Sequence, residues 1–131
     1  MCLLSSVTHW DTSSITCLTS THRDQDNPLR RNGVLGILCG LEYAAQAMGV
    51  HVGLTRNIAE HNASVGYLGA IRDLQVCHST FQQITDDLII EASLLLEQHL
   101  SFIYAFAIRA REGSLLQGRA SIFIQGSGAI T

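Results

Sequence analysis

The sequence predicts an α+β fold in which one long helix packs against an antiparallel sheet. Three features support this prediction: a segment of helix formers in the first half, apolar alternation through the second half, and a strand-like segment near the start. The chain has 131 residues, 47% of them hydrophobic and 15% charged, which corresponds to one ordinary domain. A chain of this length buries roughly two-thirds of its unfolded-state surface, so it can fold without disulfides or a metal. We therefore expect a single domain over residues 1–125, followed by a C-terminal tail over residues 126–131.

A strand and a polar loop are expected before the helix. Residues 14–19 are rich in β-branched side chains, which indicates a strand. Residues 22–33 are polar and contain the chain's only proline, Pro28, so they are expected to form a loop. The change in composition between the two segments marks the point where the chain leaves the sheet.

The predicted helix is centred on residues 41–48. This segment consists of helix formers and is apolar on nearly every face, which is typical of a helix that other elements surround. We expect the helix to end near Gly49 and Gly53, because glycine is a poor helix former. A polar connection over residues 56–64 should follow it.

The second half of the chain is expected to form strands. Alternating apolar residues over 102–108 and 116–124, joined by a turn at 112–113, predict a β-hairpin. Residues 66–76 give a weaker strand signal. Residues 87–99 fit both the alternation of a strand and the stripe of a helix, and the surrounding strands favour the strand.

Composition excludes several classes of protein. The net charge of −3 and the pI near 6.0 argue against a nucleic-acid-binding protein. All eight basic residues are Arg, so neither Schiff-base chemistry nor a P-loop lysine is available. The longest apolar stretch is interrupted by polar groups, so we expect no membrane span. Four cysteines without C-x-x-C spacing, and a start without an export signal, predict a cytoplasmic protein with reduced thiols.

Glu42 is the first candidate functional residue. It lies in the middle of an apolar helical segment, where burial of an unpaired charge is costly. Such a carboxyl group is retained when it is paired, neutralised or used in proton transfer. Gln46 lies four residues later on the same helical face and could orient it. The alternative is that Glu42 occupies a narrow solvated stripe of the helix.

Histidines and arginines supply the other candidates. None of the six histidines forms an H-x-x-x-H or H-E-x-x-H motif, so no metal site is expected. His22 follows the predicted strand, and a histidine there can be held rigidly with its ring facing a cleft; the alternative is an ordinary loop residue. Arg30 and Arg31 form a basic cluster that could bind a phosphate or an acidic carrier protein, with a solvated loop as the alternative.

Residues 27–31 and 38–48 resemble the predicted 3-hydroxyacyl-(acyl carrier protein) dehydratases of the hotdog fold. Within that family, the chain is similar to the dehydratase-like proteins of aryl-polyene-type fatty acid synthesis clusters. The likeness covers about residues 2–125, and its other landmarks are Cys2–Leu4, Trp10–Asp11, Gly66–Leu68, Arg72–Leu74 and Gly118–Ser121. The resemblance implies a long helix wrapped by a curved antiparallel sheet, and it assigns residues 87–99 to a strand.

This resemblance also implies an activity and an assembly. The expected enzyme is a cofactor-independent hydro-lyase that converts 3-hydroxyacyl thioesters on acyl carrier protein into trans-2-enoyl thioesters, in fatty acid or polyene synthesis. His22 would remove a proton from the acyl α-carbon, and Glu42 would protonate the departing hydroxyl across the interface of a homodimer or a higher even oligomer. A backbone N–H at the start of the helix would polarise the thioester carbonyl. The implied substrate-binding residues are Gly36, Gln46, Arg30 and Arg31.

The chain departs from the family pattern at the base. The position of the family's usual histidine holds Pro28 here, and His22 lies earlier in the loop. Two other functions therefore stay open. One is a hotdog acyl-thioesterase, in which Glu42 activates water or attacks the thioester. The other is a non-catalytic subunit that binds acyl chains or completes a heterodimer with an active dehydratase. Coenzyme A is the alternative carrier.

Overall fold

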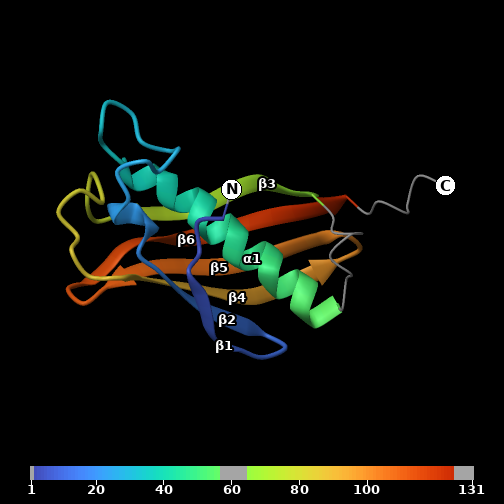
Figure 1. Ribbon diagram of the computed structural model, residues 1–131. Helices are drawn as coiled ribbons and strands as arrows, with labels where there is room; N and C mark the ends of the chain where they lie inside the picture. The colour runs from blue at the N-terminus through green and yellow to red at the C-terminus, as the bar shows by residue number, and fades with distance from the viewer. Residues whose placement is uncertain (1, 57–64, 126–131) are drawn as a thin grey trace.

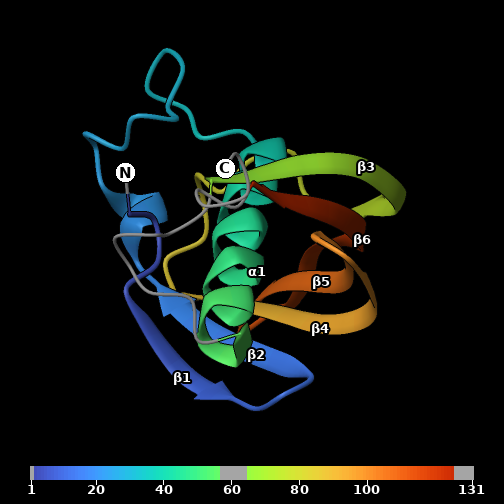
Figure 2. The same ribbon diagram turned by 90° about the vertical axis from the view of Figure 1, so that its right-hand side faces the viewer.

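A six-stranded antiparallel sheet wraps around one central helix (Figures 1 and 2). The computed structural model describes residues 2–56 and 65–125. The sheet has the order β1-β2-β4-β5-β6-β3, so β1 and β3 are its edges. The elements are β1 (Ser6–Trp10), β2 (Ser14–Thr19), the 3-10 helices η1 (Thr21–Arg23) and η2 (Ile37–Cys39), α1 (Gly40–Arg56), β3 (Val65–Val76), β4 (Leu88–Gln98), β5 (Ser101–Ala110) and β6 (Gly113–Gln125).

Strand alternation determines which face of the sheet contacts the helix. In β5, every second residue is buried on the helix side, while the intervening residues lie on the outer face. The predicted hairpin is confirmed, since β5 pairs with β6 along their whole shared length. The inward-facing residues join one core with the buried residues of α1: Tyr43, Ala44, Ala47, Met48 and Val52.

The ambiguous segment over 87–99 is confirmed as a strand. β4 pairs with β2 on one side and with β5 on the other. Its backbone N–H and C=O groups therefore form hydrogen bonds with neighbouring strands. Leu88, Ile90 and Ala92 are buried, and the residues between them face outward. The two-residue alternation of apolar side chains, and not the helical stripe, therefore describes this segment.

Two expectations about the first half were wrong in detail. The sheet includes an additional strand, β1, which pairs with β2 through a turn at Asp11 and whose residues are all exposed. The helix also continues past Gly49 and Gly53 to Arg56. The predicted tail and most of the predicted connection after Arg56 lie outside the described residues. No helix in the described part of the chain is long and apolar enough to cross a membrane.

Buried contacts explain why α1 continues through its glycines. A glycine costs a helix about 1 kcal/mol relative to alanine, and the buried contacts of His51, which lies between Gly49 and Gly53, offset that cost. His51 is fully buried, with its Nδ1 2.6 Å from the Tyr104 hydroxyl and its Nε2 2.8 Å from the Asp11 carbonyl oxygen. Because a carbonyl only accepts, Nε2 carries the proton and the Tyr104 hydroxyl donates to Nδ1. This residue ties the last turns of α1 to β5 and to the β1–β2 turn.

We expect Tyr104→Phe to destabilise the protein by about 1–3 kcal/mol, because it leaves His51 Nδ1 buried without a donor. Urea unfolding would measure the change in the free energy of unfolding. In the double variant with His51→Phe, the losses should be less than additive. A loss below about 0.5 kcal/mol for Tyr104→Phe, the range of ordinary surface changes, would contradict this role for the hydrogen bond.

Candidate active site

A buried polar network fixes the loop between β2 and α1. Asn27 is buried, and its Nδ2 donates to the Thr21 carbonyl oxygen at 2.9 Å and to the Tyr43 hydroxyl at 3.0 Å. The Thr21 hydroxyl donates to the Leu3 carbonyl oxygen at 2.6 Å, so it accepts from the Tyr43 hydroxyl, 2.9 Å away. Burial raises the pKa of Tyr43, which keeps that hydroxyl protonated. The loop and the N-terminal segment are thus held against the helix.

His22 lies in η1 at the start of this loop, and its side chain is almost completely buried, with 1% exposed. Its Nε2 is 3.1 Å from the Ile84 carbonyl oxygen, so this nitrogen carries the proton and donates. Nδ1 is then a bare acceptor, and it is buried without a hydrogen-bond partner. Burial lowers the pKa of His22 and favours the neutral ring. An edge contact with Phe81 holds the ring from the side.

The His22 side chain lines a pocket of about 360 Å³ between the β2–α1 loop and the β3–β4 loop. Its wall combines apolar groups with polar and cationic ones. The lining residues are His22, Arg23, Gln25, Arg30, Gly33, Phe81, Gln82, Ile84 and Thr85. Sequence reasoning missed the contribution of residues 81–85, because that segment reaches His22 only through the tertiary fold.

The two arginines of the predicted basic cluster have different surroundings. The guanidinium of Arg30 donates to the carbonyl oxygens of Asp24 at 2.7 Å, Gly33 at 2.7 Å and His22 at 2.9 Å. Arg30 therefore closes the loop around His22. Arg31 is exposed, and its backbone forms a short bridge with Val34. Arg31 is the member of the pair whose side chain is at the surface.

Glu42 lies in the first turn of α1 and is exposed in the single chain. Among the described residues it has no hydrogen bond and no ion pair. Leu38, one turn earlier, is 55% exposed, and Val50, two turns later, is 37% exposed. The sheet therefore leaves one flank of α1 uncovered, and Glu42 lies on it.

Gly36 lies just before the start of the helix, and Gln46 lies within it. Gly36 immediately precedes η2 and forms a β-bridge with Thr80, which joins the helix start to the β3–β4 loop. A Cβ at Gly36 would meet no neighbouring atom, so packing within this chain does not require a glycine there. The Oε1 of Gln46 accepts from the backbone N–H of Leu3 at 2.8 Å. Gln46 thus anchors the N-terminal segment one turn after Glu42.

The structure brings some of the candidate residues together and separates others. His22 and Arg30 line the same pocket, whereas Glu42 is not part of its wall. No hydrogen bond or ion pair joins His22 to Glu42 within the described chain. No group of three or more His, Cys, Asp or Glu side chains among the described residues could hold a metal ion.

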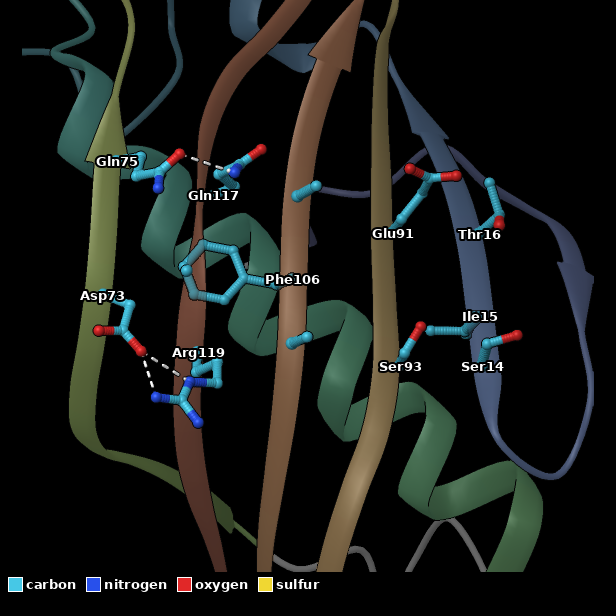
Figure 3. A pocket seen from close by; sticks show the side chains of 13 residues that line it. Ser14, Ile15, Thr16, Asp73, Gln75, Glu91, Ser93, Phe106, Gln117 and Arg119 are labelled. Carbon is cyan, nitrogen blue, oxygen red and sulfur yellow. Dashed lines mark hydrogen bonds and ion pairs between the residues drawn. The ribbon is translucent and has the colours of Figure 1, made fainter.

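A second hollow of about 520 Å³ lies on the outer face of the sheet, opposite α1 (Figure 3). Polar side chains from β2, β4, β6 and β3 surround small residues of β5 and β6. Arg119 pairs with Asp73, and Gln117 donates to Gln75 at 2.8 Å across the β3–β6 ladder. This face carries none of the residues that the sequence analysis proposed as catalytic.

A helix wrapped by a curved six-stranded antiparallel sheet is the architecture of the hotdog fold, and here a carboxylate lies on the exposed flank of that helix. The chain matches the model of the ApeP-like family, described as ApeP dehydratase, over residues 1–127. The protein belongs to the ApeP-like dehydratase family, which confirms the resemblance noted in the sequence. No curated protein was found to match the chain by sequence.

Solved structures agree with this fold. The chain is similar to one in the dehydratase heterocomplex ApeI:P from Xenorhabdus doucetiae, with a TM-score of 0.81, 24% identity, and coverage of 98% of this chain and 86% of that chain. A hypothetical thioesterase with coenzyme A from Streptococcus pneumoniae gives a TM-score of 0.63 and 12% identity over 92% of this chain and 85% of that chain. A Streptococcus mutans protein bound to acetyl coenzyme A gives a TM-score of 0.65 and 10% identity over 92% of this chain and 88% of that chain. These low identities show the fold alone.

Replacement of Arg30 by Gln should loosen the loop around His22, because hydrogen bonds from a charged donor contribute about 1.5–3 kcal/mol. Hydrogen exchange measured by mass spectrometry should show faster exchange over residues 22–33. The matched control is Arg31→Gln, which removes an exposed guanidinium with no such bonds. Equal exchange in both variants would show that Arg30 does not brace the loop.

Proposed function

We propose that the protein is a subunit of a dehydratase that converts 3-hydroxyacyl thioesters into trans-2-enoyl thioesters. One observation carries the proposal: a rigidly held histidine whose buried Nδ1 has no hydrogen-bond partner lies at a pocket, and an unpaired carboxylate lies on an uncovered helix flank. These are the two types of group that an elimination requires. Membership of the ApeP-like dehydratase family supports the same reaction.

The elimination assigns one proton transfer to each group. His22 Nδ1 takes the proton from the acyl α-carbon, and the electron pair of the broken C–H bond forms the new double bond. The bond to the β-hydroxyl breaks, and this group leaves as water with a proton from the Glu42 carboxyl. The Nε2–H···O=C bond to Ile84 keeps the imidazole in the tautomer whose Nδ1 carries no proton. Proton exchange between the two groups resets them for the next turnover.

The proposed site needs a second hotdog chain. Glu42 is absent from the wall of the His22 pocket, and its helix flank is uncovered. β3 is an edge of the sheet, and pairing with a second chain would remove that edge and bring a second helix alongside. We therefore assign His22 of one chain and Glu42 of the other to one site. A homodimer, or a higher even oligomer, is the simplest assembly, and the heterocomplex ApeI:P supports a different hotdog subunit as the alternative.

The substrate is proposed to arrive on acyl carrier protein. Arg31, an exposed cation at the loop, would contact the phosphate of the carrier arm, while Arg30 holds the loop. The backbone N–H of Gly36 at the helix start would polarise the thioester carbonyl, and Gln46 would support the flank that carries Glu42. Coenzyme A is the alternative carrier, which the coenzyme A-bound hotdog structures support. We propose a cytoplasmic location and a single domain over residues 1–125.

A thioesterase is the second candidate, because an exposed carboxylate with no partner could activate water and because thioesterases share the fold. One assay separates the candidates. Incubation with a 3-hydroxyacyl thioester gives rising enoyl absorbance without free thiol for a dehydratase, and free thiol for a thioesterase. If neither enoyl absorbance nor free thiol appears, the protein is a non-catalytic subunit and the proposed reaction is overturned.

Glu42→Gln and His22→Ala should each lower kcat/KM for the 3-hydroxyacyl thioester by about 100- to 10,000-fold, the contribution of a general acid or base. Enoyl formation is the measurement. The control variant is Glu112→Gln, which changes an exposed carboxylate at the β5–β6 turn and should leave the rate unchanged. If Glu42→Gln is inactive while His22→Ala keeps full activity, the thioesterase mechanism replaces this one.

The pH dependence of kcat/KM tests the role of His22 as a base. Burial lowers the pKa of His22 below its ordinary 6.5, and the base must be neutral to accept a proton. Activity should therefore fall as the pH drops through a midpoint that lies below 6.5. An acid-side midpoint above 6.5 would contradict this assignment.

A further inference from the structure

The outer face of the sheet has an unusual backbone feature where β3 meets β6. Asp73 has a φ of +54° in the middle of β3, and the register of the ladder shifts between Arg72 and Gln75. A non-glycine residue in this conformation costs roughly 1–2 kcal/mol. Gly118 of β6 accommodates the bulge, since a Cβ there would lie 3.2 Å from the Arg72 carbonyl oxygen. Strain that the sequence accommodates at a defined position suggests a function for the groups it displays.

The bulge determines how the charges on this face are arranged. Arg72 and Arg119 are direct cross-strand partners, and like charges in that position repel each other. The bulge brings the Asp73 carboxylate to Arg119, whose Nε donates to it at 2.9 Å (Figure 3). Asp73 therefore neutralises one of the two cations. Arg72 has no hydrogen bond or ion pair among the described residues, so the cluster keeps one positive charge.

Arg72 and Arg119 line a pocket of about 340 Å³ with both polar and apolar walls. Ser121 Oγ accepts from the Ala70 N–H at 3.0 Å, so its own proton is available for a ligand. Ile103 and Phe123 supply the apolar side, and Phe123 is 48% exposed. The other lining residues are Ala70, Ser101 and Ala120.

We propose that this pocket binds a small amphiphilic anion. Its carboxylate or phosphate head group would pair with Arg72 and accept from the Ser121 hydroxyl, and its short alkyl body would lie on Ile103 and Phe123. The bound anion would also neutralise the positive charge that Arg72 keeps. The pocket lies on the face of the sheet opposite α1, so this site is separate from the proposed dehydratase site and does not depend on it.

Titration of the full chain with octanoate, octyl phosphate and octanol, followed by backbone amide NMR, tests the proposal. Octanoate or octyl phosphate should cause saturable shifts at the amides of Ala70, Arg72 and Ser121. The tighter of the two identifies the head group. Arg72→Gln should weaken this binding about tenfold, as expected when a charge-assisted hydrogen bond is lost. The control is Arg111→Gln, which removes a highly exposed guanidinium at the β5–β6 turn and should leave the affinity unchanged.

Three results would overturn the proposal: no saturable shifts at these amides, equal affinity in wild type and Arg72→Gln, or equal binding of uncharged octanol. An acyl chain entering the dehydratase site would instead shift amides near His22 and Glu42, and Arg72→Gln would not change it. Dehydratase activity should be the same in Arg72→Gln and wild type. The experiment therefore distinguishes failure of the anion-binding proposal from failure of the dehydratase proposal.

Discussion

Packing of α1 against a single sheet buries one side of the helix and leaves the other uncovered, and the location of the candidate residues follows from this constraint. The buried side carries Tyr43 and His51, which tie the helix to the loop before it and to β5. The uncovered side carries Glu42 among exposed apolar groups. Contact of a second chain with this flank would bury the apolar groups and give the carboxyl group a partner surface. The proposed function therefore links assembly and chemistry through the same helix.

The loop before α1 holds His22, the residue proposed as the base. A histidine at the end of a strand would be mobile unless its ring and the backbone around it were both held. Here the Ile84 carbonyl oxygen fixes the ring, and Arg30 closes the loop through three backbone carbonyls. The result is a neutral imidazole with a fixed tautomer and an unused nitrogen. Such preorganisation is what proton abstraction next to a thioester requires.

Much of the fold follows from the sequence, because the two-residue period of apolar side chains leaves few alternatives to strands for β5 and β6. For β4, the periodicity was ambiguous, and the family resemblance favoured the strand. The helix end was missed, since two glycines indicate a stop and only the tertiary contacts of His51 outweigh them. At the site, the sequence singled out His22 and Glu42 by residue type and position. The sequence could not distinguish the role of Arg30 from that of its neighbour Arg31. The two differ in their hydrogen bonds, because the folded loop brings three backbone carbonyl oxygens within reach of the Arg30 guanidinium. Nor could the sequence place Phe81 and Ile84 beside His22.

The site shared between two chains is the central claim, and activity in a mixed dimer tests it most directly. A dimer of one His22→Ala chain and one Glu42→Gln chain has one site with both groups intact and one site with neither. The isolated mixed dimer should recover about half the activity of the wild-type dimer, although each variant alone has lost the acid or base contribution. If both variants fold and exchange subunits but the mixture stays inactive, His22 and Glu42 do not act across the interface.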